Sequence, residues 1–297
     1  MLPEGSYPWY SPDLKMGDHA KSIFNSLSSL QSLPHIPTAV MELQKLLGDK
    51  ESETSHLAAT VRKDPLLAAD LLSIYDRQRL MQDNLPKDKQ SLQYVIAFVG
   101  RRQLSRLVMV ASMKQFRLKT KVFNSDEFWD HSFLIASIAE YLWLKYYTPE
   151  KKDQVFLAGS LCNIGKLVGA VAWPDLTDKV CQETKNSDHQ KSWVQAETDI
   201  GLYSHCVLGE IGAAFWGFPG FVFEVIKKHH RPKTRVRSEL SRLIHVVSFA
   251  NLLSHYIKGD SFRFNLDDLQ NELSYFKIDE EGFEVLVQSV KKTVLSN

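Results

Sequence analysis

Residues Phe156–Val168 read FLAGSLCNIGKLV, and they open the longest mostly apolar run of the chain, which extends from Phe156 to Trp173. Asn163 and Lys166 interrupt this run, and three glycines lie within it. A membrane-spanning helix needs about 20 consecutive apolar residues. We therefore interpret the run as a buried helix of a protein core and expect no membrane segment.

The sequence on both sides of this run follows helical periodicity. Leu43, Leu46 and Leu47 share one face of an expected helix, and Asp64 followed by Pro65 is typical of a helix start. Gly100 is expected to separate two further helices. No alternation typical of strands is found, so the sequence predicts an all-α fold. The expected helices run from about Pro37 to Gly48, Ser52 to Val61, Pro65 to Ile74, Ser91 to Val99, Arg101 to Phe116, Phe128 to Tyr147, Gln154 to Ala172, Ala196 to Trp216, Phe221 to His230, Ser238 to Ile257, Leu266 to Tyr275 and Glu280 to Val294.

The chain is long enough for two lobes. At 297 residues it exceeds the size at which one core comfortably grows. The polar segment Lys119–Asp126 is the expected boundary between the lobes, and the sequence turns acidic after Lys258–Asp260. We expect an N-terminal arm, a main domain with two packed helical lobes, and a short acidic helical C-terminal extension. Their expected ranges are 1–25, 26–257 (lobes 26–120 and 126–257) and 258–297.

Composition and charge limit the function classes. Hydrophobic residues make up 44% of the chain and charged residues 24%, which are ordinary globular values. The net charge of +1 gives no general reason to expect a nucleic acid or an anionic membrane as partner. Three cysteines without a CxxC pair are typical of a reducing cytosol. The N-terminus has no pattern of a signal peptide, so we expect a cytoplasmic protein.

The order of several short motifs resembles the HDOD family, the HD-related output domains of bacterial signalling proteins. The resemblance covers roughly residues 30–255 and implies a multi-helix, HD-like bundle. It also implies a role in signal transduction. The matching segments are Leu33–Pro37, Asp64–Leu66, Ser91–Gly100, Trp129–Ser132, Leu161–Gly165, Trp216–Pro219, His229–His230 and Val246–Leu253.

The same resemblance implies that the metal site of HD phosphohydrolases has been lost. Those enzymes hold a divalent metal with a His, an adjacent His-Asp pair and a later Asp, and the metal generates a hydroxide that attacks phosphorus. Here His131 is retained, Cys162 and Asn163 replace the pair, and Asn251 replaces the last Asp. Neutral amides are weak partners for a hard cation. We expect a non-catalytic relic site without metal or cofactor, in which Cys162 packs as a small hydrophobe and Asn163 hydrogen-bonds with His131.

Three further histidines, His205, His229 and His230, allow two interpretations. They are either helix-end and core histidines with local hydrogen bonds, or they form a pocket with His131 for a small anion or a nucleotide phosphate. Both interpretations stay open from the sequence.

The favoured function is a non-catalytic bacterial signalling module that binds a partner protein or a small ligand. The alternative is a metal-dependent phosphohydrolase with an unusual ligand set: His131, Cys162, His205, His229 and His230. A third alternative is a nucleic-acid-binding regulator, because Arg101–Lys121 contains seven basic residues and no acid, and a second basic cluster lies at 227–237. A solvated basic face explains the same pattern and is favoured over nucleic-acid binding. The ligand, the partner and the oligomeric state are left open.

Overall fold

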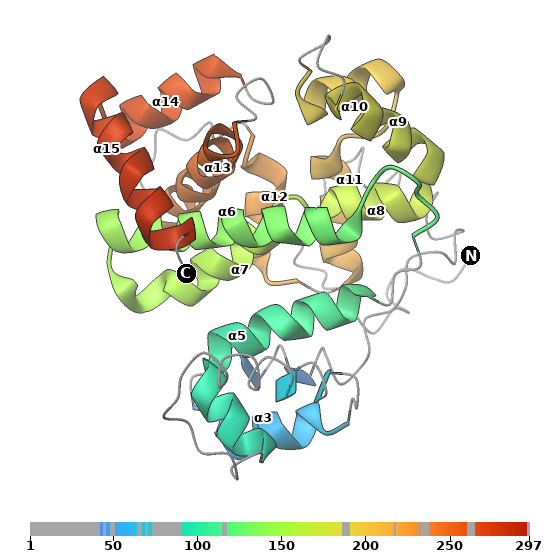
Figure 1. The fold of residues 1–297 in the computed structure, drawn as a ribbon, viewed down its shortest axis with the longest axis vertical. Helices are drawn as coiled ribbons and strands as arrows, with labels where there is room; N and C mark the ends of the chain where they lie inside the picture. Colours follow the sequence, from blue (N-terminus) through green and yellow to red (C-terminus); the bar gives the residue numbers. More distant parts are fainter. Residues whose placement is uncertain are drawn as a thin grey trace. The chain divides into compact units, whose positions relative to one another are not determined.

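The computed structural model of the chain describes residues 42–43, 46–47, 51–63, 67–68, 71–72, 91–114, 118–185, 191–216, 218–230, 232, 238–259 and 265–295. Every regular element in these ranges is helical, which confirms the predicted all-α fold (Figure 1). The chain divides into one compact unit of residues 34–117 and a second that contains residues 118–297. The predicted arm, the Leu33–Pro37 motif and the Asp64–Pro65 helix start lie outside the described residues.

In the first unit, α3 (Thr54–Val61) packs against α5 (Leu92–Lys114). Leu57 and Val61 of α3 are fully buried, as their spacing on one helix face requires. Gly100 interrupts α5 with φ 81° and ψ 159°, a conformation that glycine adopts at little cost. Two helical segments therefore meet at Gly100, as the sequence predicts.

Arg101 connects α5 to the segment around residues 46–52 through hydrogen bonds. Its Nη1 donates to the backbone carbonyl of Ser52 at 2.8 Å, and its Nη2 donates to that of Leu46 at 2.6 Å. The guanidinium is thus engaged with backbone oxygens, and the nucleic-acid alternative loses one of the side chains on which it depends.

The second unit is built around three helices, α6 (Ser125–Tyr146), α7 (Lys152–Leu161) and α13 (Glu239–Ile257). Helix α6 packs on both of the others. Its N-cap is Asn124, whose side chain accepts hydrogen bonds from the backbone N–H groups of Asp126 and Glu127. The core of the unit includes fully buried side chains of α6 and α13, among them Ile135, Ile138, Leu142, Val246 and Phe249.

The apolar run at the centre of the sequence is two helices. Helix α7 ends at Leu161, Cys162 and Asn163 form a turn, and α8 (Ile164–Ala172) follows. The prediction of one continuous helix over 154–172 is therefore wrong at this turn. Within the described part of the chain, one segment, Gln154–Ala172, is long and apolar enough to span a membrane. Its most apolar stretch is 83% buried inside the fold, as in the core helices of a globular protein.

Two other helices differ from the prediction. The expected helix over 196–216 is α10 (Trp193–Ile200) and α11 (His205–Phe215), because Gly201 ends α10 with a left-handed φ of 77°. Helix α9 (Pro174–Lys185) is absent from the predicted set. Most of its residues are polar, so its sequence has few apolar positions from which to predict a helix.

The remaining helices of this unit are α12 (Gly220–Lys228), α14 (Leu266–Phe276) and α15 (Glu280–Val290), with a short 3₁₀ turn at Pro149–Lys151 and a π-helical turn at Lys291–Leu295. Figure 1 shows α9 and α10 on one side of α13 and α14 and α15 on the other. Helices α14 and α15 contribute to the same core as α6 and α13 through Leu269, Phe283, Leu286, Val287 and Val290.

Candidate functional site

The positions that match the HD pair lie in the turn between α7 and α8. The Nδ2 of Asn163 donates to the Oδ1 of Asn251 on α13 at 3.2 Å, and it also points at the Sγ of Cys162 at 3.6 Å. Asn163 is 1% exposed and Asn251 is 4% exposed. The two amides that replace the expected carboxylates thus hydrogen-bond to each other in the protein interior.

Cys162 is fully buried, and its thiol donates to the backbone carbonyl of Gly159 at 3.2 Å. Burial raises the pKa of this thiol to about 12, so it stays protonated at neutral pH. Metal ligation by cysteine needs the thiolate. A hard divalent ion of the HD type therefore does not fit this group of residues, which offers two neutral amides and a protonated thiol.

His131 of α6 is not a member of the group of potential ligand atoms that includes the other three predicted histidines. Its ring centroid is 4.6 Å from that of His255 at the end of α13. Among the described residues, the four side chains whose potential ligand atoms lie within 4.8 Å of one another are His205, Cys206, His229 and His230. The structure thus brings three of the four predicted pocket histidines together, and it adds Cys206 in place of His131.

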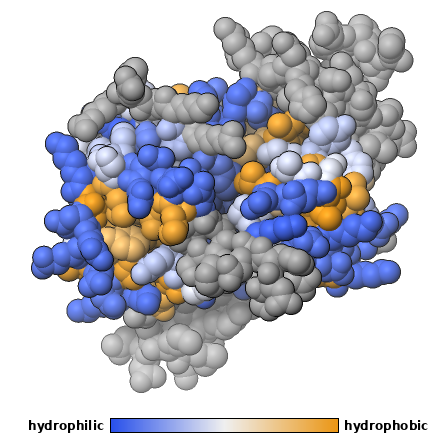
Figure 2. All heavy atoms as spheres, turned by 90° about the horizontal axis from the view of Figure 1, so that it is seen from above, coloured by the Kyte–Doolittle hydropathy of each residue, from blue (hydrophilic) through white to orange (hydrophobic). Residues whose placement is uncertain are grey.

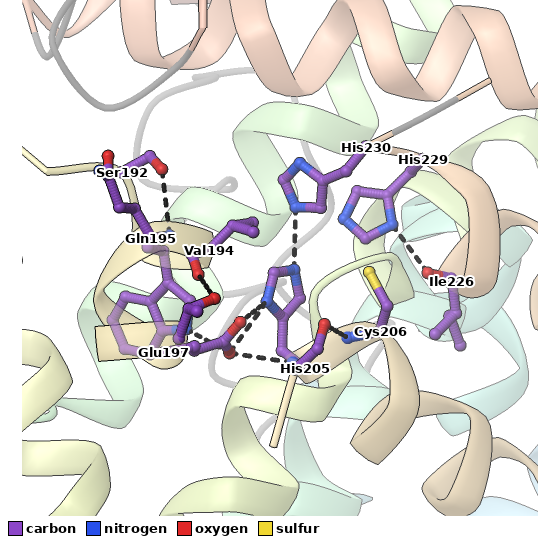
Figure 3. A network of polar contacts seen from close by, with 12 residues as sticks. Ser192, Val194, Gln195, Glu197, His205, Cys206, Ile226, His229 and His230 are labelled. Carbon is purple, nitrogen blue, oxygen red and sulfur yellow. Dashed lines mark hydrogen bonds and ion pairs between the residues drawn. The ribbon is translucent and has the colours of Figure 1, made fainter. Parts of the chain in front are cut away.

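The histidine cluster, by which we mean His205, Cys206, His229 and His230, joins the start of α11 to the end of α12. Ser204 caps α11 by accepting a hydrogen bond from the N–H of Cys206, and His229 and His230 follow the last turn of α12. The Nε2 atoms of His205 and His230 lie 2.9 Å apart (Figure 3).

Glu197 of α10 binds the Nδ1 side of the His205 ring, opposite the Nε2 that faces His230. Both of its carboxylate oxygens lie 3.0 Å from the Nδ1 of His205, and Oε1 also accepts from the backbone N–H of His205 at 2.9 Å. The Nε1 of Trp193 donates to the same oxygen at 2.8 Å. Glu197 is 2% exposed, so a buried carboxylate with three donors sets the orientation of the imidazole.

This arrangement determines the charge of the cluster. Burial alone would lower the pKa of His205, but the Glu197 carboxylate, followed by the Cys206 side chain, outweighs it and raises the pKa to about 9. Burial, followed by the neighbouring His229 and His205, holds the pKa of His230 well below its ordinary value. At neutral pH the protonated Nε2 of His205 accordingly donates to the Nε2 lone pair of His230.

The pKa of His229, unlike that of His205, is lowered. Its Nδ1 donates to the backbone carbonyl of Ile226 at 2.9 Å, and burial, followed by the charge of His205, lowers its pKa to about 3. The ring is therefore neutral, with its lone pair on Nε2. That nitrogen is buried and has no hydrogen-bond partner among the described residues.

A pocket of about 870 Å³ lies beside the cluster, between α6, α9, α10, α13 and α14. Its size suits a nucleotide or another small ligand. His131 and His230 both line it, and so does Trp193, over whose ring the Nζ of Lys166 lies 4.8 Å from the centroid. Its other charged residues are of both signs: Lys185, Lys258, Glu127, Asp130, Asp199 and Asp268. Figure 2 looks onto this face and shows hydrophilic side chains around a hollow.

One edge of the pocket is fixed by a buried carboxylate. Asp178 of α9 accepts the backbone N–H groups of Lys121, Val122 and Phe123 at 2.7 to 2.9 Å, and Phe123 lines the pocket. Burial alone would raise the pKa of Asp178, but the three donors outweigh it and hold the pKa below its ordinary value. Neither this anchor nor the roles of Glu197 and Cys206 are among the features that the sequence predicts.

A model of the HDOD domain matches residues 33–232 of the chain. A protein of Treponema pallidum (strain Nichols), uncharacterised by its description, is 23% identical over 263 residues, which cover 85% of this chain and 47% of the relative. The chain thus spans about half the length of the curated relative that it matches.

Solved structures show the same fold at low identity. An HDOD domain protein of unknown function from Geobacter sulfurreducens has a TM-score of 0.63 and 18% identity, covering 92% of this chain and 97% of that one. A protein of Shewanella amazonensis SB2B, described as a candidate phosphohydrolase, has a TM-score of 0.64 and 20% identity over 94% and 96% of the two chains. A protein of Marinobacter aquaeolei VT8, described as a candidate signal transduction protein, has a TM-score of 0.73 and 17% identity over 95% and 64%.

Proposed function

This chain belongs to the HDOD domain family, and we propose that it acts as a non-catalytic bacterial signalling module, which binds a small ligand or a partner protein on a scaffold related to HD phosphohydrolases. The observation that carries the proposal is the hydrogen bond between Asn163 and Asn251 at 3.2 Å. In a catalytic HD site these two positions hold carboxylates, whose charge offsets that of the metal. Here the amide nitrogen of Asn163 donates to the amide oxygen of Asn251, so neither position carries a charge that could offset that of a metal.

Electrostatics support the loss of hydrolysis. A hydroxide forms at neutral pH because a bound cation lowers the pKa of its water. A hard cation needs anionic oxygen ligands, and the positions of the HD pair and the last Asp supply none. His131 alone is not sufficient, and the buried Cys162 thiol stays protonated.

The pocket supports the small-ligand form of the proposal. Its volume of about 870 Å³, the indole of Trp193 and the ammonium of Lys166 suit a ligand that has both a flat and a polar part. The basic cluster at 227–237 gives less support to nucleic-acid binding. Lys227 is paired with Glu210 at 3.3 Å, and Lys228 is paired with Glu224.

A second candidate, a metal-dependent phosphohydrolase, is favoured by one observation. His230 belongs both to the histidine cluster and to the pocket wall, so a metal held there would lie next to a ligand. Against it, His131 and Cys162 of the predicted ligand set lie outside that cluster, as far as the described residues go.

Turnover assays separate the two candidates. The full chain is incubated with p-nitrophenyl phosphate and with bis-p-nitrophenyl phosphate in the presence of Mn²⁺, Mg²⁺, Fe²⁺ or Zn²⁺. We expect no turnover above that of the His131→Ala variant. Metal-dependent turnover that His131→Ala or His230→Ala abolishes would overturn the proposal in favour of the phosphohydrolase.

Ligand binding is tested separately by thermal denaturation with a panel of mononucleotides and cyclic dinucleotides. A ligand of the pocket raises the unfolding midpoint, because it binds the folded state alone. The rise should be lost in Lys166→Ala and retained in Lys179→Ala, which removes an exposed lysine of α9 outside the pocket. A panel without any binder would favour the partner-protein form of the proposal.

A further inference from the structure

We propose that His205, Cys206, His229 and His230 form a four-coordinate site for a borderline-soft divalent cation of the Zn²⁺ class. The site is distinct from the relic HD site of Cys162, Asn163 and Asn251. It does not depend on the proposed function, because binding of a metal here neither requires nor supplies a ligand in the pocket.

Convergence of the side chains is the first support. The four potential ligand atoms lie within 4.8 Å of one another. In a tetrahedral site with metal–nitrogen distances of about 2.0 to 2.1 Å, neighbouring nitrogens are about 3.3 Å apart. The Nε2 atoms of His205 and His230 lie 2.9 Å apart, so the two rings have to separate by only a few tenths of an ångström.

The orientation of the rings is the second and independent support. The Nδ1 of His205 faces the Glu197 carboxylate, and the Nδ1 of His229 donates to the carbonyl of Ile226. Metal-binding histidines typically direct one ring nitrogen at such an acceptor and present the other to the ion. The Nε2 of His229 is buried without a hydrogen-bond partner in the described chain, which is an unfavourable state that a cation would relieve (Figure 3).

The donor set indicates the class of ion. Three imidazoles and one thiolate favour Zn²⁺ and similar borderline ions, whereas Mg²⁺ and Ca²⁺ need oxygen ligands that these four residues lack. Four protein ligands fill a tetrahedron and leave no position for water, which is the pattern of a structural site. The ion would tie the first turn of α11 to the end of α12, where His230 forms part of the pocket wall.

Cobalt substitution tests the site, with Co²⁺ as the probe added to the full chain after treatment with a chelator. We expect one equivalent to bind with the intense d–d bands of tetrahedral cobalt and a thiolate-to-cobalt charge-transfer band. Cys206→Ser should remove the charge-transfer band, while Cys162→Ser and Cys181→Ser should retain it. Glu197→Gln keeps a hydrogen-bond acceptor but removes the charge, and it should weaken Co²⁺ binding about 10- to 100-fold.

A second measurement uses the unmodified chain, in case Cys206→Ser does not fold. Zn²⁺ should protect the half-buried Cys206 from alkylation by iodoacetamide, with mass spectrometry to identify the modified cysteine. Absence of the charge-transfer band, its persistence in Cys206→Ser, or equal alkylation of Cys206 with and without Zn²⁺ would each overturn the proposal.

Discussion

A Cβ atom built on Gly165 of α8 would lie 1.8 Å from the backbone carbonyl oxygen of His205 in α11. The same atom would lie 2.5 Å from the backbone nitrogen of Gly209, one turn further along α11. The two helices thus cross in direct backbone contact. Because Gly165 follows Asn163 by two residues, this contact also sets the relic turn beside the start of α11, where the histidine cluster begins.

Gly165→Ala should destabilise the protein by about 3 kcal/mol or more, because the overlap is with backbone atoms and not with a flexible side chain. This loss would occur although alanine is about 1 kcal/mol better than glycine in a helix interior. The measurement is urea denaturation followed by circular dichroism. Gly220→Ala is the control, because a Cβ there meets nothing within 4 Å. Equal stability of Gly165→Ala and the unchanged chain would show that α8 and α11 can separate freely.

Replacement of Asp178 by asparagine should make stability depend less on pH. The pKa of Asp178 is lowered in the folded state, so its charge stabilises the fold above its ordinary pKa of about 4. That stabilisation is lost as the pH falls through the folded pKa. The difference in unfolding free energy between the two chains should be constant from neutral pH to about pH 5 and shrink below about pH 4.

Asp175→Asn is the matched control for this measurement, because Asp175 lies exposed on the same helix. We expect it to leave the unfolding free energy unchanged across the range. A difference between Asp178→Asn and the unchanged chain that stays constant down to pH 2 would contradict the role of the carboxylate as an anchor for residues 121–123.

Glu272→Ala should destabilise the protein by about 3 kcal/mol, because it breaks a buried pair and leaves one partner alone. The Nδ1 of His245 lies 2.9 Å from the Oε2 of Glu272, and the two side chains are 8% and 2% exposed. Burial raises the pKa of Glu272 even though the hydrogen bond from His245 opposes the rise. Chemical denaturation measures the effect, with the exposed Glu281→Ala as the control on α15.

Replacement of both partners by leucine should recover part of this loss, because two apolar side chains leave no buried group unpaired. A Glu272→Ala variant as stable as the unchanged chain would show that α14 is held to α13 by its apolar side chains alone, without the His245–Glu272 pair.

Restoration of the HD ligands should create a metal site where the chain now has amides. In Cys162→His/Asn163→Asp/Asn251→Asp, two buried carboxylates replace a hydrogen-bonded amide pair, so the metal-free variant should be less stable. Mn²⁺ should then stabilise it by about 2.7 kcal/mol at 100 times the dissociation constant. Thermal denaturation with and without Mn²⁺ measures this effect.

An added His131→Ala exchange is the control for the restored site, and it should remove most of the stabilisation. Cys206→Ser in the same background excludes a contribution of the histidine cluster. Equal stabilisation by Mn²⁺ of a Cys206→Ser chain that keeps Cys162, Asn163 and Asn251 would show that these residues already hold a metal, contrary to the proposed function.

The fold was predictable where apolar periodicity is strong. Leu57 and Val61 share one buried face, and Gly100 has the unusual φ that its position suggests. Helix α9 escaped prediction because most of its residues are polar. The turn at Cys162–Asn163 escaped because neither residue is a strong helix breaker, and the apolar pattern continues on both sides of it.

The candidate site was predictable only in its local parts. Cys162 and Asn163 are recognisable because they lie within a short motif. His229 and His230 are recognisable because they are adjacent in the sequence. The contact of Glu197 with His205 joins two helices through a turn at Gly201, and the periodicity of one supposed helix over 196–216 concealed it. Cys206 adjoins His205, but its approach to His229 and His230 depends on how α11 packs against α12.

Trp193 gives the protein an optical reporter of its own. Its indole N–H donates to Glu197, which orients the ring of His205 in the histidine cluster. Its ring lies under the ammonium of Lys166 and lines the pocket. The emission of an indole depends on nearby charge and on its exposure to solvent. The emission of Trp193 should therefore respond to a ligand in the pocket and to an ion among the histidines. The chain has six tryptophans, so the contribution of Trp193 is obtained as the difference between the unchanged chain and Trp193→Phe. Occupancy of either site could then be followed by fluorescence without an attached dye.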